Sequence, residues 1–234
     1  MRSRLHGSVL MAEELGYEVV GVIDNDYFVG YEHDGLKIIG TLSDLQSTES
    51  NNVTDMKDHV EFFPTKYFVS DKNSQINQTR ISIIDILDKT NVKVANLISP
   101  TSNLHKLDIN LGKGIHAGNN TNFSVDCEIK DYATIYMLSC ISGGTVIGRN
   151  SFIGSQCFLG DNVVIGDNCI VNSVSAIGTS TINNEVITIG DNSIIGLGMV
   201  VMTSVPPNSV ILPIEKNHRR IYNKLSYINN EGNK

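Results

Sequence analysis

The second half of the chain has an aliphatic residue at every sixth position. The frame holds nine times in succession, misses once at Asn183, and then resumes. The residues in this frame are Ile129, Ile135, Ile141, Ile147, Ile153, Leu159, Ile165, Val171, Ile177, Ile189, Ile195 and Val201. A period of six predicts one short strand and a turn per unit, with three units closing a coil of about 18 residues. We therefore expect a triangular prism of stacked coils, its aliphatic side chains pointing inward.

The residues between the aliphatic positions fit tight corners. Glycine often follows the aliphatic residue, and Asp-Asn pairs recur at 161, 167 and 191, which suits unusual backbone angles at turns. The position four residues after the aliphatic one is mostly small. Cys127, Cys157 and Cys169 occupy it, so we interpret these cysteines as packing residues and not as nucleophiles.

The miss at Asn183 indicates an insertion. Six extra residues would advance the prism by one face, so we expect a stretch within residues 179–186 to loop out. A tolerated surface insertion and a loop that lines a pocket both fit this pattern.

The first hundred residues read as alternating helices and strands. Residues 8–26 predict an amphipathic helix with Val9, Leu10 and Leu15 on its apolar face, a stop at Gly16 and a buried strand. Further strands are predicted at 66–71 and 93–98, a helix at 77–90, and a loop with a short helix within 43–60. This alternation predicts a small open parallel sheet.

A nucleotide-binding α/β domain normally starts with a strand and a glycine-rich turn ahead of its first helix. Here Met1 falls about where that turn would be. We therefore expect a shortened Rossmann-like domain, either trimmed or recorded from too late a start.

Composition and charge narrow the function classes. Lys and Arg total 18 against 25 Asp and Glu, and the net charge of −7 argues against a broad nucleic-acid or anionic-membrane surface. No apolar run approaches a membrane span and no signal peptide is apparent, so a cytoplasmic protein is expected. The four cysteines show no C-x-x-C spacing and the six histidines no ligand cluster, so neither disulfides nor a metal site is predicted.

A small α/β domain followed by a hexapeptide rod resembles the bacterial nucleotide-sugar N-acyltransferases. The family is typified by the UDP-4-amino-sugar acetyltransferase of bacillosamine synthesis, with sialic acid O-acetyltransferases as relatives. The resemblance rests on "AEELGYEVVGVIDND", "VANLISPTSNL" and the rod from Ile129 to "IGDNSIIGLGMVVMTSVPPNSV". It implies a left-handed parallel β-helix, a homotrimer, and an acyl-CoA bound along a groove between subunits.

The resemblance also implies where the nucleotide binds. The family's residues after the second strand contact the base, and Asp24 and Asn25 hold these positions here. Carboxylate and amide groups suit the edge of uracil or thymine. A turn formed by Asp24, Asn25 and Asp26 is the alternative.

The family's catalytic pair is a histidine followed by a carboxylate, in the context V-x-H-[DE]-x-x-I-G. Aligned without gaps, "ISGGTVIG" places Gly143 at the histidine and Gly144 at the carboxylate. A general base is worth roughly 10² to 10⁴ in rate, and glycine supplies none.

Three explanations for Gly143 remain open. In the first, the sugar amine attacks the thioester as its free base, so the enzyme only has to position the two substrates, and N-acylation is favoured over O-acylation. Another residue serves as base, the candidates being Asp161, His116 and Tyr136. In the third, the chain is a relative of the family that has lost catalytic activity.

Contacts to acyl-CoA are predicted at two places. The stretch Gly196, Leu197 and Gly198 offers backbone groups to pantetheine. The family's G-x-P-A-K end motif appears only as "ILPIEK", where Lys216, with Arg219 and Arg220, would neutralise phosphates. Alternatively these cations lie on the exposed face of a terminal helix over 216–228, packed through Ile221, Leu225 and Ile228.

The sequence thus predicts a nucleotide-binding domain over 1–98, a left-handed β-helix over 99–213, and a C-terminal helix and tail over 214–234. The predicted activity is transfer of an acetyl or longer acyl group from acyl-CoA to the amino group of a dTDP- or UDP-linked amino-deoxy sugar, for a surface polysaccharide or glycoprotein. The alternatives are a non-catalytic scaffold or nucleotide-sugar-binding protein, and an acyltransferase for another small amine. No nucleic acid and no metal are expected as partners.

Overall fold

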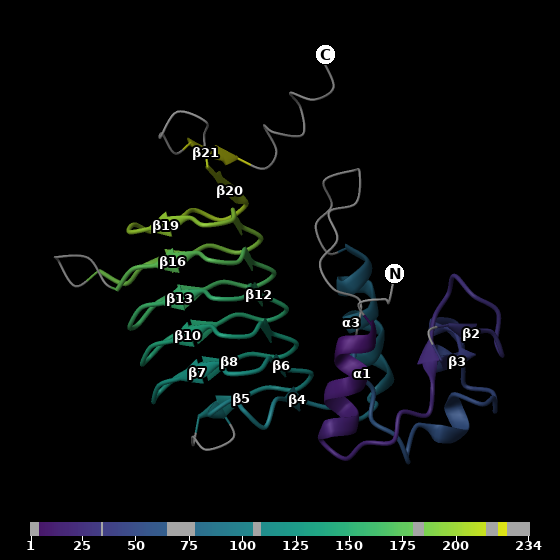
Figure 1. The fold of residues 1–234 in the computed structure, drawn as a ribbon. Coiled ribbons are helices and arrows are strands. Elements are labelled where there is room, and N and C mark those ends of the chain that lie inside the picture. Colours follow the sequence, from purple (N-terminus) through teal and green to yellow (C-terminus); the bar gives the residue numbers. More distant parts are fainter. Residues whose placement is uncertain are drawn as a thin grey trace. The chain divides into compact units, whose positions relative to one another are not determined.

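The computed structural model divides the chain into two compact units, Met1–Leu97 and Ile98–Lys234 (Figure 1). The structure describes residues 5–33, 35–64, 78–104, 109–179, 185–213 and 220–223. No helix among the described residues has the length and apolar character needed to cross a membrane.

The first unit begins with the predicted helix. Helix α1 (Leu5–Glu14) ends before Gly16, whose φ of 87° is one that glycine adopts without a steric penalty. The apolar face differs from the prediction, because Ser8 and Met11 are buried whereas Leu10 is exposed.

The sheet of the first unit is mixed, so the prediction of an open parallel sheet is wrong in part. Strand β1 (Val22–Ile23) pairs in parallel with β3 (Leu36–Gly40), as the helix–strand alternation predicts. Strand β2 (Glu32–His33) pairs with β3 in antiparallel orientation. The turn that joins them contains Gly35 at φ 81°, and such a short connection permits only an antiparallel pair.

Two helices complete the core of the first unit. Helix α2 (Leu42–Gln46) is capped by Thr41 and a short 3₁₀ helix spans Thr54–Met56, within the region predicted to hold a short helix. Helix α3 (Gln78–Thr90) matches the helix predicted for 77–90. The buried residues of this core include Ile38, Leu45, Val53, Ile84 and Leu87. The strand predicted at 66–71 lies outside the described residues. In the other predicted strand, Val94 forms a parallel bridge with Phe62, and β4 (Leu97–Ile98) begins the rod.

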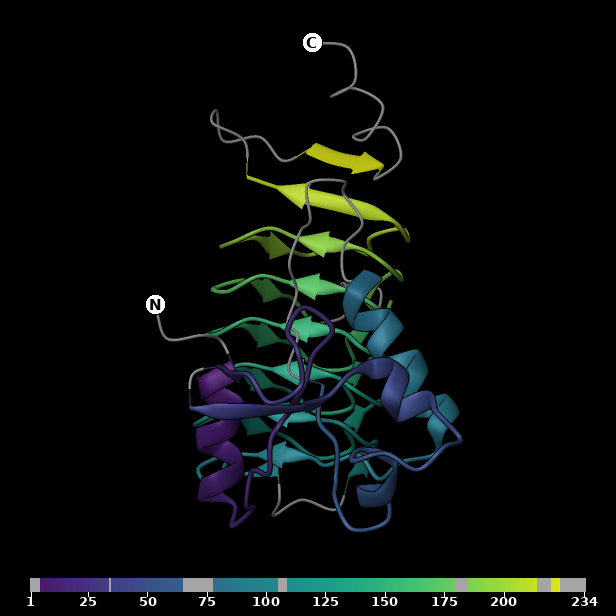
Figure 2. The ribbon, with the colours of Figure 1, turned by 90° about the vertical axis from the view of Figure 1, so that its right-hand side faces the viewer.

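The second unit is a left-handed β-helix, which confirms the predicted prism (Figures 1 and 2). Two-residue strands stack in parallel in three sheets, and partners in register are mostly 18 residues apart. The first sheet comprises β5 (Asn110–Leu111), β8 (Glu128–Ile129), β11 (Val146–Ile147), β14 (Val164–Ile165) and β17 (Thr188–Ile189). The second comprises β7 (Asn122–Phe123), β10 (Cys140–Ile141), β13 (Phe158–Leu159), β16 (Ala176–Ile177) and β19 (Val200–Val201). The third comprises β4, β6 (His116–Ala117), β9 (Thr134–Ile135), β12 (Phe152–Ile153), β15 (Ile170–Val171), β18 (Ile194–Ile195), β20 (Ser209–Leu212) and β21 (Arg220–Asn223).

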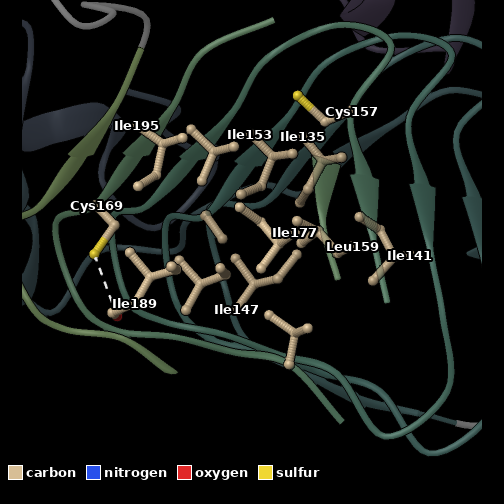
Figure 3. Packing of buried hydrophobic residues seen from close by; sticks show 14 of the residues in the cluster. Ile135, Ile141, Ile147, Ile153, Cys157, Leu159, Cys169, Ile177, Ile189 and Ile195 are labelled. Atoms are coloured by element: carbon tan, nitrogen blue, oxygen red, sulfur yellow. Dashed lines mark hydrogen bonds between the residues drawn. The ribbon is translucent and has the colours of Figure 1, made fainter. Parts of the chain in front are cut away.

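The aliphatic residue of each hexapeptide points into the prism (Figure 3). Ile135, Ile147, Ile153 and Ile195 have no exposed side-chain surface, and they belong to one continuous core cluster. The core cluster also contains the corner residue four positions later, such as Cys127, Val163 and Met199, so two positions of each hexapeptide fill the rod while the other residue of the two-residue strand faces outward.

The insertion predicted around Asn183 does not move the following strands to another face of the prism. Strand β17 still pairs with β14 in the first sheet, with Val164 opposite Thr188, so partners here are 24 residues apart instead of 18. The prism therefore resumes on the face it would have used. Asn183 and residues 180–184 lie outside the described residues.

The two ends of the rod differ in how well the sequence predicts them. Leu111, Ala117 and Phe123 continue the six-residue frame ahead of Ile129, with one strand each, inside the range 99–213 predicted for the β-helix. At the other end, the terminal helix predicted over 216–228 is wrong at Arg220–Asn223, which form β21 paired in antiparallel orientation with β20. Strand β20 is the last of its sheet to be paired in parallel, and β21 satisfies backbone groups along its remaining edge.

Candidate functional site

Gly143 lies in the turn between β10 and β11, where the second sheet meets the first. A Cβ atom added there would lie 3.4 Å from the Val125 carbonyl oxygen, 3.6 Å from Ser124 Oγ and 3.8 Å from Asp161 Oδ1. These are ordinary contact distances. The fold therefore does not require glycine at this position.

Gly144 is different, because it is held at φ 68°. The matching turn position in other coils carries residues such as Asp126, Asn150 and Asn162, also at positive φ. A side chain at 144 would collide with the Asn162 carboxamide in the next coil. A carboxylate at 144 would therefore require Asn162 to move.

Asp161 is brought directly beside Gly143. Its Oδ1 accepts a hydrogen bond from the Gly143 backbone N–H at 3.1 Å. Asp131, Asp167 and Asp191 make the same bond to the preceding coil at another corner of the prism, with N···O distances of 3.0, 2.8 and 2.8 Å. Asp161 thus has the structural role of a repeated corner residue and is the carboxylate next to position 143.

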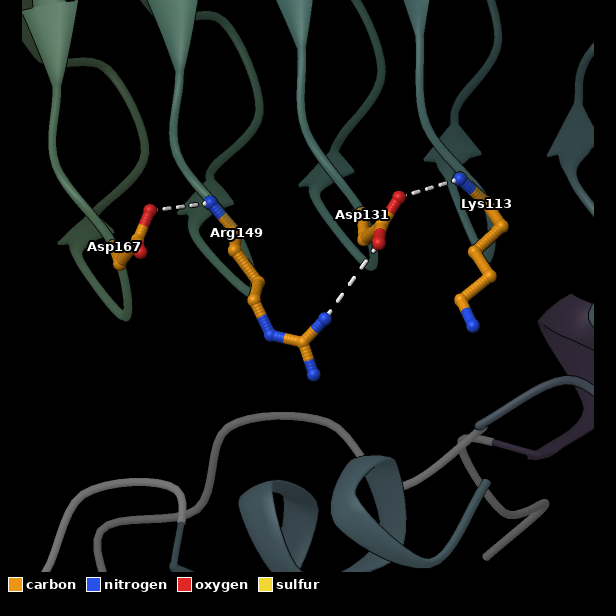
Figure 4. A network of polar contacts seen from close by, with 4 residues as sticks. All are labelled: Lys113, Asp131, Arg149 and Asp167. Carbon is orange, nitrogen blue, oxygen red and sulfur yellow. Dashed lines mark hydrogen bonds and ion pairs between the residues drawn. The ribbon is translucent and has the colours of Figure 1, made fainter. Parts of the chain in front are cut away.

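The corner between the first and third sheets carries a polar ladder that the sequence analysis did not single out (Figure 4). Along it, Lys113, Asp131, Arg149 and Asp167 occupy successive coils, and Arg149 Nη1 lies 3.6 Å from Asp131 Oδ2. The Arg149 guanidinium also lies over the buried Tyr132 ring, 4.9 Å from its centroid.

This ladder borders an open groove of about 310 Å³, lined by Asn110, Gly112, Glu128, Ile129, Lys130, Asp131, Arg149 and Asp167. Carboxylates and cations alternate along it, and Arg149 pairs with Asp131 whereas Lys113 Nζ lies over the Tyr132 ring, 5.7 Å from its centroid. Exposed pairs of this kind add at most about 1 kcal/mol to stability. The sequence signal for the ladder is a charged residue two positions after the aliphatic residue in four hexapeptides spaced 18 residues apart.

His116 and Tyr136 do not share the Gly143 corner. His116 lies in β6 and Tyr136 directly follows β9, both on the third sheet, which forms the prism face opposite that corner. The His116 ring is buried and meets the Tyr136 ring edge-on at 5.8 Å, and Tyr136 meets Phe152 at 4.9 Å. These side chains form an aromatic cluster away from position 143.

Asp24 and Asn25 lie in the first unit, directly after β1. Asp24 Oδ1 accepts from the Asp26 N–H at 2.7 Å, and Asn25 Oδ1 accepts from the Leu42 N–H at 2.9 Å. Asp24 therefore shapes the turn, as the turn alternative requires, whereas Asn25 attaches the loop to the first residue of α2.

The residues predicted to contact acyl-CoA are partly committed to the fold. Gly196, Leu197 and Gly198 form the turn between β18 and β19, and Gly196 and Gly198 donate their N–H groups to Ile211 and Ser173. Leu197 projects outward and is 63% exposed. Lys216 and Arg219 lie outside the described residues, and Arg220 begins β21.

Three of the four cysteines are packing residues, as predicted. Cys127, Cys157 and Cys169 are buried at corners, whereas Cys140 is exposed. Burial raises the pKa of the Cys169 thiol to about 11, so it is protonated at neutral pH. Within the described ranges, no cluster of three or more His, Cys, Asp or Glu residues is arranged to hold a metal ion.

Residues 144–178 match the family model described as bacterial transferase hexapeptide (six repeats). Comparison with curated proteins finds no match.

Several solved structures share the fold of nearly the whole chain. PerB from Caulobacter crescentus, in complex with CoA and GDP-perosamine, has a TM-score of 0.70 at 17% identity, covering 94% of this chain and 93% of that one. The acetyltransferase domain of PglB from Neisseria gonorrhoeae, in complex with acetyl coenzyme A, has a TM-score of 0.61 at 16% identity, covering 94% and 95%. WeeI from Acinetobacter baumannii has a TM-score of 0.55 at 16% identity, covering 93% and 94%. This chain therefore carries a bacterial transferase hexapeptide repeat and has the fold of the hexapeptide-repeat acetyltransferases.

Proposed function

We propose that the protein transfers an acyl group from acyl-CoA to the amino group of a nucleotide-linked amino-deoxy sugar. The observation that carries this proposal is the likeness in fold, over nearly the full length of both chains, to PerB, which was solved with CoA and GDP-perosamine. The order of the two units is the same, with an α/β unit ahead of the rod. We place the reaction in the cytoplasm, where acyl-CoA is available, and its product in a surface polysaccharide or glycoprotein.

The Gly143 corner favours an amine acceptor. The amine nitrogen attacks the thioester carbonyl, a C–N bond forms, the C–S bond breaks, and the proton lost by the amine passes to water or to the departing thiolate. An amine that is partly unprotonated near neutral pH attacks without a protein base, provided that both substrates are positioned. A hydroxyl group has a far higher pKa and lacks this option.

Two alternatives differ in what they predict. A non-catalytic scaffold or nucleotide-sugar-binding protein is favoured by the Gly143-Gly144 pair, since neither residue offers a side chain for chemistry. An acyltransferase for another small amine would keep CoA binding and lose the need for Asp24 and Asn25.

The direct test is thiol release from acetyl-CoA, and from a longer acyl-CoA, with a panel of dTDP-, UDP- and GDP-linked 3-amino and 4-amino sugars. We expect turnover that rises with pH as the acceptor amine loses its proton, because the protein supplies no base at position 143. A protein that binds CoA but acylates none of these amines would contradict the proposed acceptor. A protein that binds neither acetyl-CoA nor the longer acyl-CoA would support the non-catalytic alternative.

Asp24→Ala is the matched variant for the acceptor site. We expect it to raise the KM for the nucleotide sugar and to leave CoA affinity unchanged, because Asp24 is proposed to contact the base. An unchanged KM for the acceptor would remove Asp24 from the site.

We further propose that the protein is a homotrimer, with exposed apolar residues of the rod at its interface. Along the corner between the third and second sheets, Leu138, Val174 and Leu197 are 53%, 57% and 63% exposed. Leu138 and Val174 each have a φ of 62°, which costs roughly 1–2 kcal/mol for such residues. Exposed Phe158 and Val200 follow on the adjoining second sheet. Bulky apolar residues kept outside at this cost are typical of a surface that a second copy covers.

The double variant Leu138→Asn with Val174→Asn tests this interface. Asparagine adopts positive φ readily, so each chain should remain folded, whereas the apolar contact is lost. We expect sedimentation velocity to report a monomer for the double variant and a trimer for the wild type. Val20→Asn, at an exposed valine of the first unit, is the control and should leave the mass unchanged. A double variant that still sediments as a trimer would exclude this corner from the interface.

A further inference from the structure

A short loop leaves the first-unit sheet at Asp24 and returns to it at Gly30. Both ends are held by the same strand, since the Asp24 N–H donates to the Gly40 carbonyl at 3.1 Å and the Gly30 N–H donates to the Ile38 carbonyl at 2.8 Å. Strand β3 lies between β1 and β2, so the loop passes from one edge of β3 to the other, a span of roughly 10 Å. The loop has only seven residues, and Tyr27 and Phe28 at its tip follow Asp24 by three and four residues.

The tip of the loop is aromatic. Tyr27 and Tyr31 stack face to face, with centroids 5.1 Å apart and planes within 2° of each other. Phe28 meets Tyr31 edge-on at 5.4 Å and is 72% exposed, the largest exposed fraction among the large hydrophobic residues that the structure describes. A stacked tyrosine pair thus supports a phenylalanine ring that faces solvent.

The electrostatics of this region disfavour a phosphate-binding role for the loop. Between Leu5 and Leu36 the sequence has no Lys or Arg, and Asp24, Asp26 and Glu32 flank the aromatic residues. A phosphate group placed against this loop would be repelled, so the phosphates of any ligand bound here must point away from it. A flat, neutral ring system with hydrogen-bond donors on its edge would fit, because it can stack on an aromatic face while its N–H groups point to a carboxylate.

We propose that Phe28, supported by the Tyr27–Tyr31 stack, is the platform on which the base of the nucleotide sugar stacks. This inference rests on the proposed function. Asp24 and Asn25, at the start of the same loop, then lie at the edge of the base. A carboxylate acceptor selects bases with a ring N–H donor, so uracil, thymine and guanine are favoured over adenine and cytosine. Stacking supplies affinity for any base, whereas the edge contacts supply the choice among them.

The chain contains no tryptophan, which gives a direct optical test. Phe28→Trp places a single indole at the platform, and we expect UDP, dTDP or GDP to quench its fluorescence in a saturable way. Ribose 5-phosphate and inorganic pyrophosphate carry no base and should leave it unchanged.

Calorimetry with the same nucleoside diphosphates gives the energetic test. Phe28→Ala is expected to weaken nucleoside diphosphate binding about tenfold or more while CoA binding stays the same. Phe28→Leu keeps an apolar side chain but removes the ring, so it should be nearly as weak as the alanine variant. Leu10→Ala removes an exposed apolar side chain elsewhere in the first unit and serves as the control.

The outcomes separate this inference from the proposed function. If nucleoside diphosphates bind the wild type and Phe28→Ala changes their affinity less than twofold, the platform is wrong and the proposed function stands. If no nucleoside diphosphate or nucleotide sugar binds the wild type, while CoA does, the nucleotide-linked acceptor is wrong and the platform falls with it. A Phe28→Ala variant whose only change is a lower sedimenting mass would reassign the loop to contact between copies of the chain.

Discussion

Gly148→Ala is expected to lower the free energy of unfolding by about 3 kcal/mol or more, the upper range for overpacking a tight site. Gly148 follows β11, and a Cβ atom there would lie 2.7 Å from the Asp167 N and would overlap the carbonyl group of Gly166 in the next coil. Both contacts are with backbone, which cannot rotate away as a side chain can. The neighbouring coils would have to separate, which would strain the bond from the Gly148 N–H to the Ile165 carbonyl, now 2.8 Å.

Urea-induced unfolding, followed by far-UV circular dichroism at one protein concentration, measures this loss. Gly143→Ala is the matched control, because its Cβ meets only ordinary contact distances; its expected change is within about 0.5 kcal/mol. Equal urea midpoints for the two variants would show that neighbouring coils can separate at little cost, and would contradict this prediction.

Gly143→His is expected to increase the rate of acyl transfer at neutral pH about 10²-fold, the lower end of what a general base contributes. The turn has room for the Cβ atom, and Asp161 Oδ1 lies 3.8 Å from its position, so a carboxylate is close to the new imidazole. That negative charge favours the imidazolium and raises the pKa of the histidine. The gain should therefore be present above the histidine pKa and be lost as the pH falls through it, because only the neutral imidazole accepts a proton.

Pre-steady-state thiol release from acetyl-CoA across pH distinguishes the two enzymes. The wild-type rate should follow the unprotonated fraction of the acceptor amine alone, and the variant should add a second titration near the histidine pKa. Gly143→Gln matches the histidine approximately in size and does not titrate, so it controls for side-chain bulk. If histidine and glutamine give the same profile, position 143 does not face the acceptor amine.

Position 143 illustrates what the sequence could and could not say about the site. The motif alignment placed Gly143 at the family's histidine position, Asp161 follows it by 18 residues, one coil of the rod, and the structure joins the two residues by a 3.1 Å hydrogen bond. That a side chain fits at 143 but collides at 144 could not be inferred from the sequence, because it depends on Asn162 in the next coil. His116 and Tyr136, named from the sequence as candidate bases, lie on the prism face opposite this corner.

The loop at Asp24 is a second feature that the sequence predicts only in part. The residues "DNDYF" indicate a turn, but the stacking of Tyr27 on Tyr31 is seen only in the structure, where both ends of the loop are hydrogen-bonded to β3. Two aromatic residues four positions apart in a loop have no fixed relation in the sequence. Their stacking depends on a hairpin, β2 with β3, that the sequence analysis did not predict.

By itself, the sequence determined the prism of the rod, its inward residues from Ile129 to Ile177 and the packing role of three cysteines. It could do so because every coil repeats the same local pattern, in which the aliphatic residue and the corner residue four positions later face inward. The tertiary structure decided the mixed first sheet and the strand β21 where a helix was expected. These features depend on which backbone edge is left to pair, and that is settled between segments distant in the chain.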